Sequence, residues 1–206
     1  MLRRAAFAVI ALGLAVPAAA QDRMPPIPAE RLTDAQKKAI DEFKAARNVD
    51  LSGPFWPLLR SPEVMSRARA MGDYLRFTSV LPPRLSEFAI IITARQWTQQ
   101  YEWDVHAPLA EKGGLKPAII AAIADGRRPE AMAEDEDVLY TFCDELHRTQ
   151  GISDATYARA VKAFGEQGVV DILGISGYYT KLAMVLNTAR TPVPAGHTPG
   201  LRAFPR

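Results

Sequence analysis

The 206-residue sequence predicts an all-α protein, a bundle of about seven helices. The first observation is that apolar residues recur at helical spacing, as in Leu85, Phe88, Ile91 and Ile92. The second is that helix start and stop signals repeat along the chain. The third is that no segment alternates apolar and polar residues with the period of two that a half-buried strand requires. Together these patterns favour a single helical domain.

Several expected helices begin at a capping residue or a proline, and some end at glycine. Thr33 and Gln36 form a capping-box pattern, and Ser61-Pro62 places proline at the first helical position. Gly113-Gly114 is a C-terminal stop signal. Residues 48–56 are expected to form a loop. The segments expected to be helical are 33–47, 61–77, 82 to near 97, 99–112, 116–125, 135–149, 153–164 and 168–188.

The last helix carries two glycines, Gly174 and Gly177. Glycine is costly inside a helix, so we expect both to allow another helix to approach closely.

The N-terminus has the layout of a secretory signal peptide, residues 1–20, cleaved before Gln21. Arg3 and Arg4 precede an uncharged apolar run, which ends at Pro17 and three alanines. A membrane anchor is the alternative, but the run is shorter than the roughly 20 residues that span a bilayer. The sequence therefore predicts a secreted or periplasmic protein, with no membrane association after cleavage. No later segment is expected to be long and apolar enough to cross a membrane.

The rest of the chain divides into a flexible linker (21–31), the helical domain (32–190) and a proline-rich tail (191–206) that is expected to be extended or disordered. Two of the 25 Lys and Arg residues lie in the leader, which leaves 23 against 23 Asp and Glu. This balance gives no reason to expect nucleic acid as a partner. Cys143 is the one cysteine, so an intramolecular disulfide is excluded, and we expect a buried, inert thiol.

Acidic residues and a histidine are clustered in an otherwise apolar region. Glu102 and His106 are four residues apart on one expected helix, and Glu87 lies on the preceding antiparallel helix. Such a pair in an apolar cavity is suited to proton transfer. One alternative is an ordinary surface contact between Glu102 and His106. Another is a metal site of the two carboxylates and the imidazole. We expect no metal and no cofactor.

The residues around this cluster resemble a known family. The run from Tyr101 to Leu115 is similar to the E-W-x-x-H-x-P-L-A-x-x-x-G-L signature of carboxymuconolactone decarboxylase family proteins, and the run from Glu87 to Arg95 resembles their E-x-x-I-L-x-x-A-R helix. The resemblance extends over roughly residues 50–190 and implies an alkyl hydroperoxidase D-like helical bundle. In the related alkyl hydroperoxidase D-type proteins, two cysteines stand where this chain has Gln99 and Glu102. Thiol peroxidase or disulfide reductase activity is therefore not expected.

The resemblance implies a carboxy-lyase that acts by acid/base chemistry on a small carboxylated lactone or organic acid. His106 would be the general acid/base, Glu87 would orient it or share its proton, and Glu102 would be a second acid/base or would tune His106. Arg95 would neutralise a substrate carboxylate. The residues expected to bind the substrate are Arg95, Gln99, Tyr101 and Trp103. A non-catalytic ligand-binding or scaffold protein is the alternative. The resemblance also implies a homo-oligomer, a trimer or a hexamer.

Overall fold

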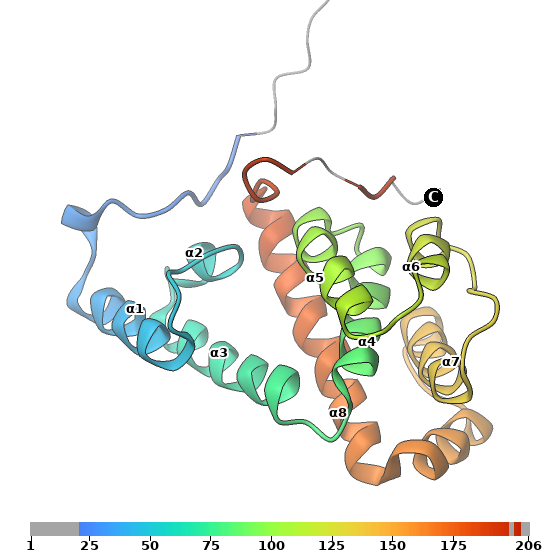
Figure 1. Cartoon of the computed structure of the whole chain (residues 1–206). Coiled ribbons are helices and arrows are strands. Elements are labelled where there is room, and N and C mark those ends of the chain that lie inside the picture. Colours follow the sequence, from blue (N-terminus) through green and yellow to red (C-terminus); the bar gives the residue numbers. More distant parts are fainter. Residues whose placement is uncertain (1–20, 198–199, 203–206) are drawn as a thin grey trace, which may run out of the picture.

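The computed structural model describes residues 21–197 and 200–202, so the predicted signal peptide lies outside the described residues. Within those residues the chain is all helical, with eight α-helices and one short 3₁₀ helix and no strand (Figure 1). The predicted all-α class is therefore confirmed. The elements are 3₁₀ helix Ala29–Arg31, α1 Asp34–Arg47, α2 Phe55–Leu58, α3 Pro62–Phe77, α4 Pro83–Gln96, α5 Gln100–Lys112, α6 Pro117–Ala124, α7 Glu134–Thr149 and α8 Asp154–Ala189.

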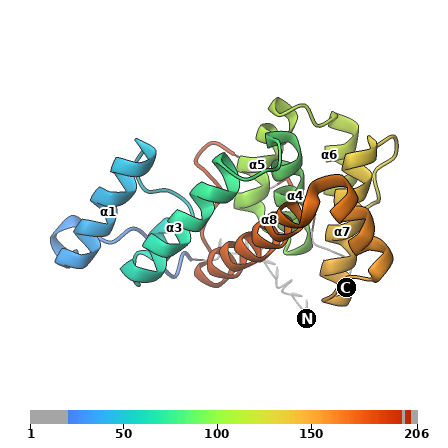
Figure 2. The ribbon, with the colours of Figure 1, turned by 90° about the horizontal axis from the view of Figure 1, so that it is seen from below.

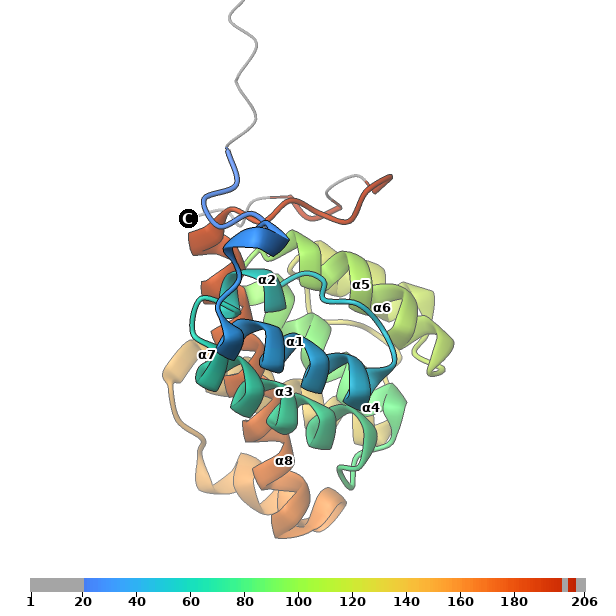
Figure 3. The ribbon, with the colours of Figure 1, turned by 90° about the vertical axis from the view of Figure 1, so that its left-hand side faces the viewer.

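Helix α4 is the centre of the bundle. Its residues from Leu85 to Arg95 are all buried, because α5, α7 and α8 pack around it. Helices α1, α2 and α3 form a layer on one side of α8, and α6 and α7 lie on the other side (Figures 1 and 2). Seen from the first side, α1, α2 and α3 form the near face of the molecule (Figure 3). The site described below lies between this layer and the α4–α5 pair.

The last two expected helices, 153–164 and 168–188, both lie within the element α8, where the non-helical backbone of Gly165 separates them. The backbone there has φ 69° and ψ 172°, a conformation that L side chains rarely adopt. Farther along α8, a Cβ at Gly174 would lie 2.9 Å from Cδ2 of Leu75, which confirms the expected close approach of a neighbouring helix. The expectation for Gly177 is wrong, because a Cβ there would meet nothing within 4 Å.

Part of the expected loop 48–56 is helical. Phe55 to Leu58 form the one-turn helix α2, in which Phe55, Pro57 and Leu58 are buried. Helix α2 packs against α3 and α8. A single turn is too short to show helical periodicity in the sequence, so tertiary burial decides its conformation.

Both segments that flank the helical domain make specific contacts with it. The backbone N–H of Arg23 donates to the carbonyl of Ala189 over 2.7 Å. In the C-terminal segment, the Leu201 N–H donates to Oε1 of Gln100 (2.9 Å), and Nε2 of Gln100 donates back to the Leu201 carbonyl (2.6 Å). The Leu201 side chain is only 6% exposed. The described end of the tail is therefore seated on α5.

Among the described residues, α8 is the one helix that is long and apolar enough by composition to cross a membrane. The expectation that no segment after the leader meets this criterion is therefore wrong. The apolar window of α8 is 56% buried inside the bundle. The core helix of a helical bundle can have the same composition and burial, so we draw no conclusion about a membrane from α8.

Candidate functional site

A tight turn between α4 and α5 brings the predicted acid/base residues together. Thr98 in this turn has a left-handed φ of 45°. Gln99 is the N-cap of α5, and its side-chain oxygen accepts from the N–H of Tyr101 (2.6 Å) and the N–H of Glu102 (3.2 Å). This cap fixes where α5 begins. The resulting antiparallel pairing places Glu87 on α4 beside His106 on α5.

The imidazole of His106 lies between two carboxylates. Its Nδ1 is 2.6 Å from Oε2 of Glu87, and its Nε2 is 3.3 Å from Oε2 of Glu102. His106 and Glu102 are each 3% exposed, and Glu87 is 8% exposed. Both ring nitrogens donate N–H bonds only when the imidazole is protonated. The arrangement therefore favours the imidazolium form of His106.

The charge of His106 depends on a competition between burial and its partners. Burial alone would lower the pKa of His106, because an apolar environment disfavours the charged ring. The hydrogen bonds to Glu102 and Glu87, with their negative charges, outweigh burial and raise the pKa above its ordinary value. His106 consequently holds its proton to a higher pH than a free histidine does.

Residues from α3 and α8 complete the surroundings of this cluster. The Nη2 atom of Arg76, on α3, is 3.8 Å from Oε1 of Glu87. The ring of Tyr179, on α8, meets the His106 ring edge-on, with 5.0 Å between ring centroids and an interplanar angle of 84°. The ring of Tyr178 meets that of Tyr179 in the same edge-on manner, at 5.2 Å. A guanidinium and two aromatic rings thus hold the Glu–His–Glu group in place.

A cavity of about 130 Å³ lies against this group. Its wall combines side chains from α1, α2, α3, α5 and α8 and from the segment that precedes α2. The lining residues are Arg47, Ser52, Pro54, Phe55, Arg76, Tyr101, Glu102, Val105, His106, Tyr178, Tyr179 and Leu182. Arg47 is already held by Asp73, with 2.7 Å between Nε and Oδ1, and its guanidinium lies 4.7 Å from the centroid of the Phe55 ring.

The four residues expected to bind a substrate do not all reach this cavity. Tyr101 lines it. Gln99 instead caps α5, and its amide donates to Oδ1 of Asn187 over 2.9 Å. Trp103 is one residue past Glu102, hence about 100° around the helix. Its ring lies beside the tail, where a Cβ at Gly200 would be 3.7 Å from it. Gln99 and Trp103 thus contact the surroundings of the cavity and not its interior.

Arg95 points away from the cavity. It follows Glu87 by eight residues, which is about 80° around and about 12 Å along α4. Its guanidinium donates to the carbonyl of Arg202 over 2.8 Å. The expected role of Arg95 beside the His106 group therefore finds no support in its position.

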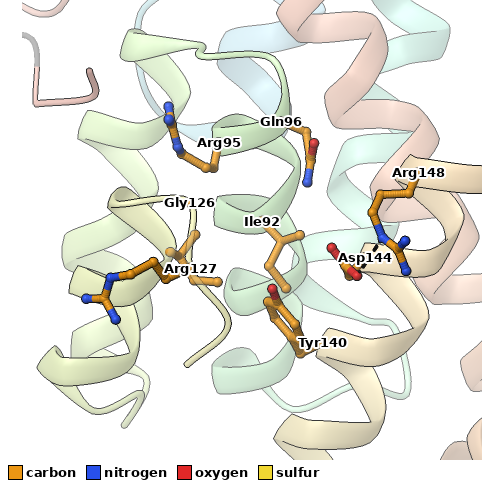
Figure 4. A pocket seen from close by; sticks show the side chains of 9 residues that line it. Ile92, Arg95, Gln96, Gly126, Arg127, Tyr140, Asp144 and Arg148 are labelled. Atoms are coloured by element: carbon orange, nitrogen blue, oxygen red, sulfur yellow. Dashed lines mark hydrogen bonds and ion pairs between the residues drawn. The ribbon is translucent and has the colours of Figure 1, made fainter. Parts of the chain in front are cut away.

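Arg95 instead borders a second cavity of about 220 Å³, between α4, α7 and the segment after α6. The side chains of Arg127 and Arg95 are directed away from the space between Ile92 and Tyr140, and Arg148 is paired with Asp144 (Figure 4). The cationic groups of this second cavity therefore do not converge on one ligand position.

Arg76, Arg47, Tyr178 and Tyr179 were not among the residues expected at the site. One signal in the sequence points to Arg76. Ala68, Gly72 and Arg76 are spaced by four, and Ala68 and Gly72 are buried, so Arg76 continues the buried face of α3. The sequence contains no comparable signal for the two tyrosines, because most of α8 is apolar on several sides.

The Glu–His–Glu group is not arranged as a metal site. Within the described part of the chain, no group of three His, Cys, Asp or Glu side chains is placed to hold a metal ion. Glu87 and Glu102 bind opposite nitrogens of the His106 ring, so their oxygens do not converge on a common point. A metal ligand set needs such convergence.

Comparison with known proteins gives a match at the level of the fold. No protein-family model and no curated protein matches the sequence. The structure is similar to a crystal structure of a protein of unknown function from Agrobacterium tumefaciens, described there as a proposed antioxidant defence protein AhpD. The TM-score is 0.55 and the identity is 18%, over 67% of this chain and 95% of that chain. The chain therefore has an AhpD-like fold, as the resemblance in its sequence implied.

Proposed function

We propose that this protein is an acid/base catalyst that acts on a small organic acid or carboxylated lactone, in the manner of a carboxy-lyase. The observation that supports this proposal is the buried His106 imidazole, held between Glu87 and Glu102 at the wall of a small cavity. A protonated histidine in such a place is a general acid whose proton is retained near neutral pH.

The proposed step is the loss of a carboxylate from a carbon that is conjugated to a carbonyl group. The bond between that carbon and the carboxylate breaks, and carbon dioxide leaves. The electron pair remains on the substrate as an enolate, which then takes a proton from His106, either directly or through Glu102. A water molecule returns a proton to the imidazole, and the hydroxide that remains combines with the carbon dioxide to form bicarbonate. The step needs no change of oxidation state in the protein and no thiol.

Arg76 replaces Arg95 as the proposed partner of the substrate carboxylate. Arg76 lines the cavity, whereas Arg95 borders a different one. The guanidinium of Arg76 is 3.8 Å from Glu87, a separation longer than a hydrogen bond, so this pairing leaves donors for a ligand.

Thiol chemistry has no support at this site. In the sequence resemblance, Gln99 and Glu102 fall at the two positions that the cysteine pair has in alkyl hydroperoxidase D-type proteins. Cys143 is completely buried on α7, and its burial raises the pKa of the thiol to about 12. A thiolate, which is the reactive form, is therefore absent near neutral pH.

The test is an assay of carbon dioxide release by the purified protein from 4-carboxymuconolactone and from small 3-oxo acids. His106→Gln is expected to lower turnover by about 100-fold or more, which is the usual contribution of a general acid. His147→Gln is the matched control, because His147 lies on α7 and contacts Thr93 instead of the cavity. Equal turnover in His106→Gln and the native protein would refute the mechanism. Saturable ligand binding without turnover would favour the non-catalytic alternative.

We also propose that the chain is exported through its N-terminal leader and that it self-associates. Exposed apolar side chains on α8, among them Val170, Leu173 and Met184, support an interface between copies. Light scattering on the purified protein distinguishes a trimer or hexamer from a monomer.

A further inference from the structure

The wall of the first cavity contains two buried polar atoms of opposite hydrogen-bonding character. Among the described residues, neither Nε of Arg76, which is a donor, nor Oε1 of Glu102, an acceptor when the side chain is ionised, has a hydrogen-bond partner. Buried polar groups are paired in the great majority of proteins, so two exceptions on one cavity call for an explanation.

Each of these two side chains contacts a neighbouring residue through an atom other than its unpaired atom. The Nη2 atom of Arg76 faces Glu87, and Oε2 of Glu102 faces Nε2 of His106. Both residues line the cavity. The contacts that hold the two side chains therefore leave one donor and one acceptor without a hydrogen-bond partner in the described part of the protein.

One cation of the cavity wall is less tightly paired than the others. Arg47, Arg76 and protonated His106 are cationic, and Glu102 is the one acid among the residues that line this cavity. Arg47 is paired with Asp73 at 2.7 Å, and His106 lies between Glu87 and Glu102, whereas Arg76 is 3.8 Å from Glu87. The guanidinium of Arg76 is therefore the cation that is best able to bind an anionic group of a ligand. A carboxylate is the group that a guanidinium binds with the best geometry.

The volume of the cavity indicates how much of a ligand it can surround. An enclosed protein cavity of about 150 Å³ holds one benzene molecule, which has six non-hydrogen atoms. A cavity of about 130 Å³ therefore encloses a molecule, or a part of one, of roughly that size.

We propose that this cavity binds a small hydroxy acid, whose carboxylate accepts a hydrogen bond from Arg76 and whose hydroxyl or enol O–H donates one to Glu102. The inference deepens the proposed function, since it names the substrate class of the same site. It concerns binding, so it is tested without turnover.

The test compares three probes of nearly equal size by isothermal titration calorimetry. Lactate carries both groups, propionate lacks the hydroxyl, and propane-1,2-diol lacks the carboxylate. We expect saturable binding of lactate, with propionate and the diol each bound at least about tenfold more weakly, since each leaves one buried polar atom unpaired. Equal binding of lactate and propionate, or no binding of lactate, would overturn the inference.

Two variants assign each group of the probe to its residue. Glu102→Gln is expected to reduce the preference for lactate over propionate, and Arg76→Met to reduce the preference for lactate over the diol. Glu111→Gln on α5 and Arg67→Met on α3 are the exposed controls, which should keep both preferences. Unchanged preferences in Glu102→Gln and Arg76→Met would show that lactate binds elsewhere.

His106→Gln separates this inference from the proposed function. If His106→Gln abolishes turnover but lactate shows no preference over propionate in the native protein, then the catalytic proposal stands and the hydroxy-acid inference fails. If lactate is preferred but no substrate is turned over by the native protein, then the inference stands and the catalytic proposal fails.

Discussion

The Nδ1 atom of His106 lies 2.6 Å from Oε2 of Glu87, although the two residues are 19 positions apart and belong to different helices. The contact crosses the interface between α4 and α5, which are joined by a three-residue connection that ends at the capping residue Gln99. The charge of the imidazole is thereby linked to the packing of these two helices. Stability and catalysis are consequently both expected to depend on the protonation of one ring.

Stability should fall as the pH rises above the ordinary histidine range. The folded pKa of His106 is raised above the unfolded value of 6.5. The protonated ring therefore contributes its full stabilisation below pH 6.5, and this contribution is lost as the pH rises through the folded pKa. We expect the urea midpoint to decrease between pH 6.5 and 9 in the native protein and to decrease less in His106→Gln.

His147 provides a contrast in the same experiment. Burial lowers the pKa of His147, so its contribution to stability is lost as the pH falls below 6.5. The two histidines thus act in separate pH windows. An identical slope above pH 6.5 in His106→Gln and the native protein would show that His106 is not protonated preferentially in the folded state.

Glu87→Gln should change the pH dependence of turnover as well as its rate. The substitution keeps the shape of the side chain but removes one negative charge beside the ring, which lowers the pKa of His106. Because the proposed mechanism needs the protonated ring, we expect the alkaline limb of the pH–rate profile to move to lower pH. Turnover near pH 8 should fall by about 100-fold.

Glu111→Gln, on the exposed side of α5, is the control for Glu87→Gln and should leave the profile unchanged. A uniform loss of activity at every pH in Glu87→Gln would instead indicate a purely structural role for Glu87.

Gly72→Ala should damage the site through Tyr178. A Cβ at Gly72 would lie 2.6 Å from Cζ of Tyr178, so the buried ring has to shift. Tyr178 lines the cavity and contacts Tyr179, so the shift should propagate to the surroundings of His106. We expect a loss of about 1–3 kcal/mol in the free energy of unfolding, which is typical of overpacking.

We also expect Gly72→Ala to bind ligand more weakly than the native protein does under conditions where both are fully folded. Under those conditions the loss of stability cannot account for the weaker binding. Gly177→Ala is the matched control on α8, because a Cβ there would meet nothing within 4 Å. If both variants bind ligand as the native protein does, the position of Tyr178 is unimportant for the site.

The part of the site that could be predicted from the sequence is the part that depends on short distances along the chain. The four-residue spacing of Glu102 and His106 and the antiparallel connection from Glu87 follow from helix geometry alone. Tyr178 was missed because it comes from α8, and its position depends on which helix faces pack together. That packing is set by close approaches such as the one between Gly72 and Tyr178, which a single sequence does not reveal.

Arg95 lies inside a recognisable motif, but its position on the helix places it at a different cavity from His106. It shares α4 with Glu87, but it is more than two turns farther along that helix.

The attachment of the C-terminal segment to α5 should depend on Gln100. Its side chain makes two hydrogen bonds with the backbone of Leu201, so Gln100→Ala removes both at once. We expect faster proteolytic trimming of the tail by carboxypeptidase, with turnover unchanged because Gln100 does not line the cavity. Equal trimming rates in Gln100→Ala and the native protein would show that other contacts are sufficient to hold the segment.

Cys143 separates thiol chemistry from acid/base chemistry. The thiol is completely buried, lies 4.0 Å from the Ser176 hydroxyl and has a pKa raised by burial to about 12. We therefore expect an aromatic disulfide reagent at pH 8 to react with it slowly in the folded protein and rapidly in urea. Cys143→Ala should retain turnover, with a modest loss of stability because a small cavity replaces the sulfur. Hydroperoxide reduction that disappears in Cys143→Ala would contradict this view and would place the reactive group on α7 instead of at His106.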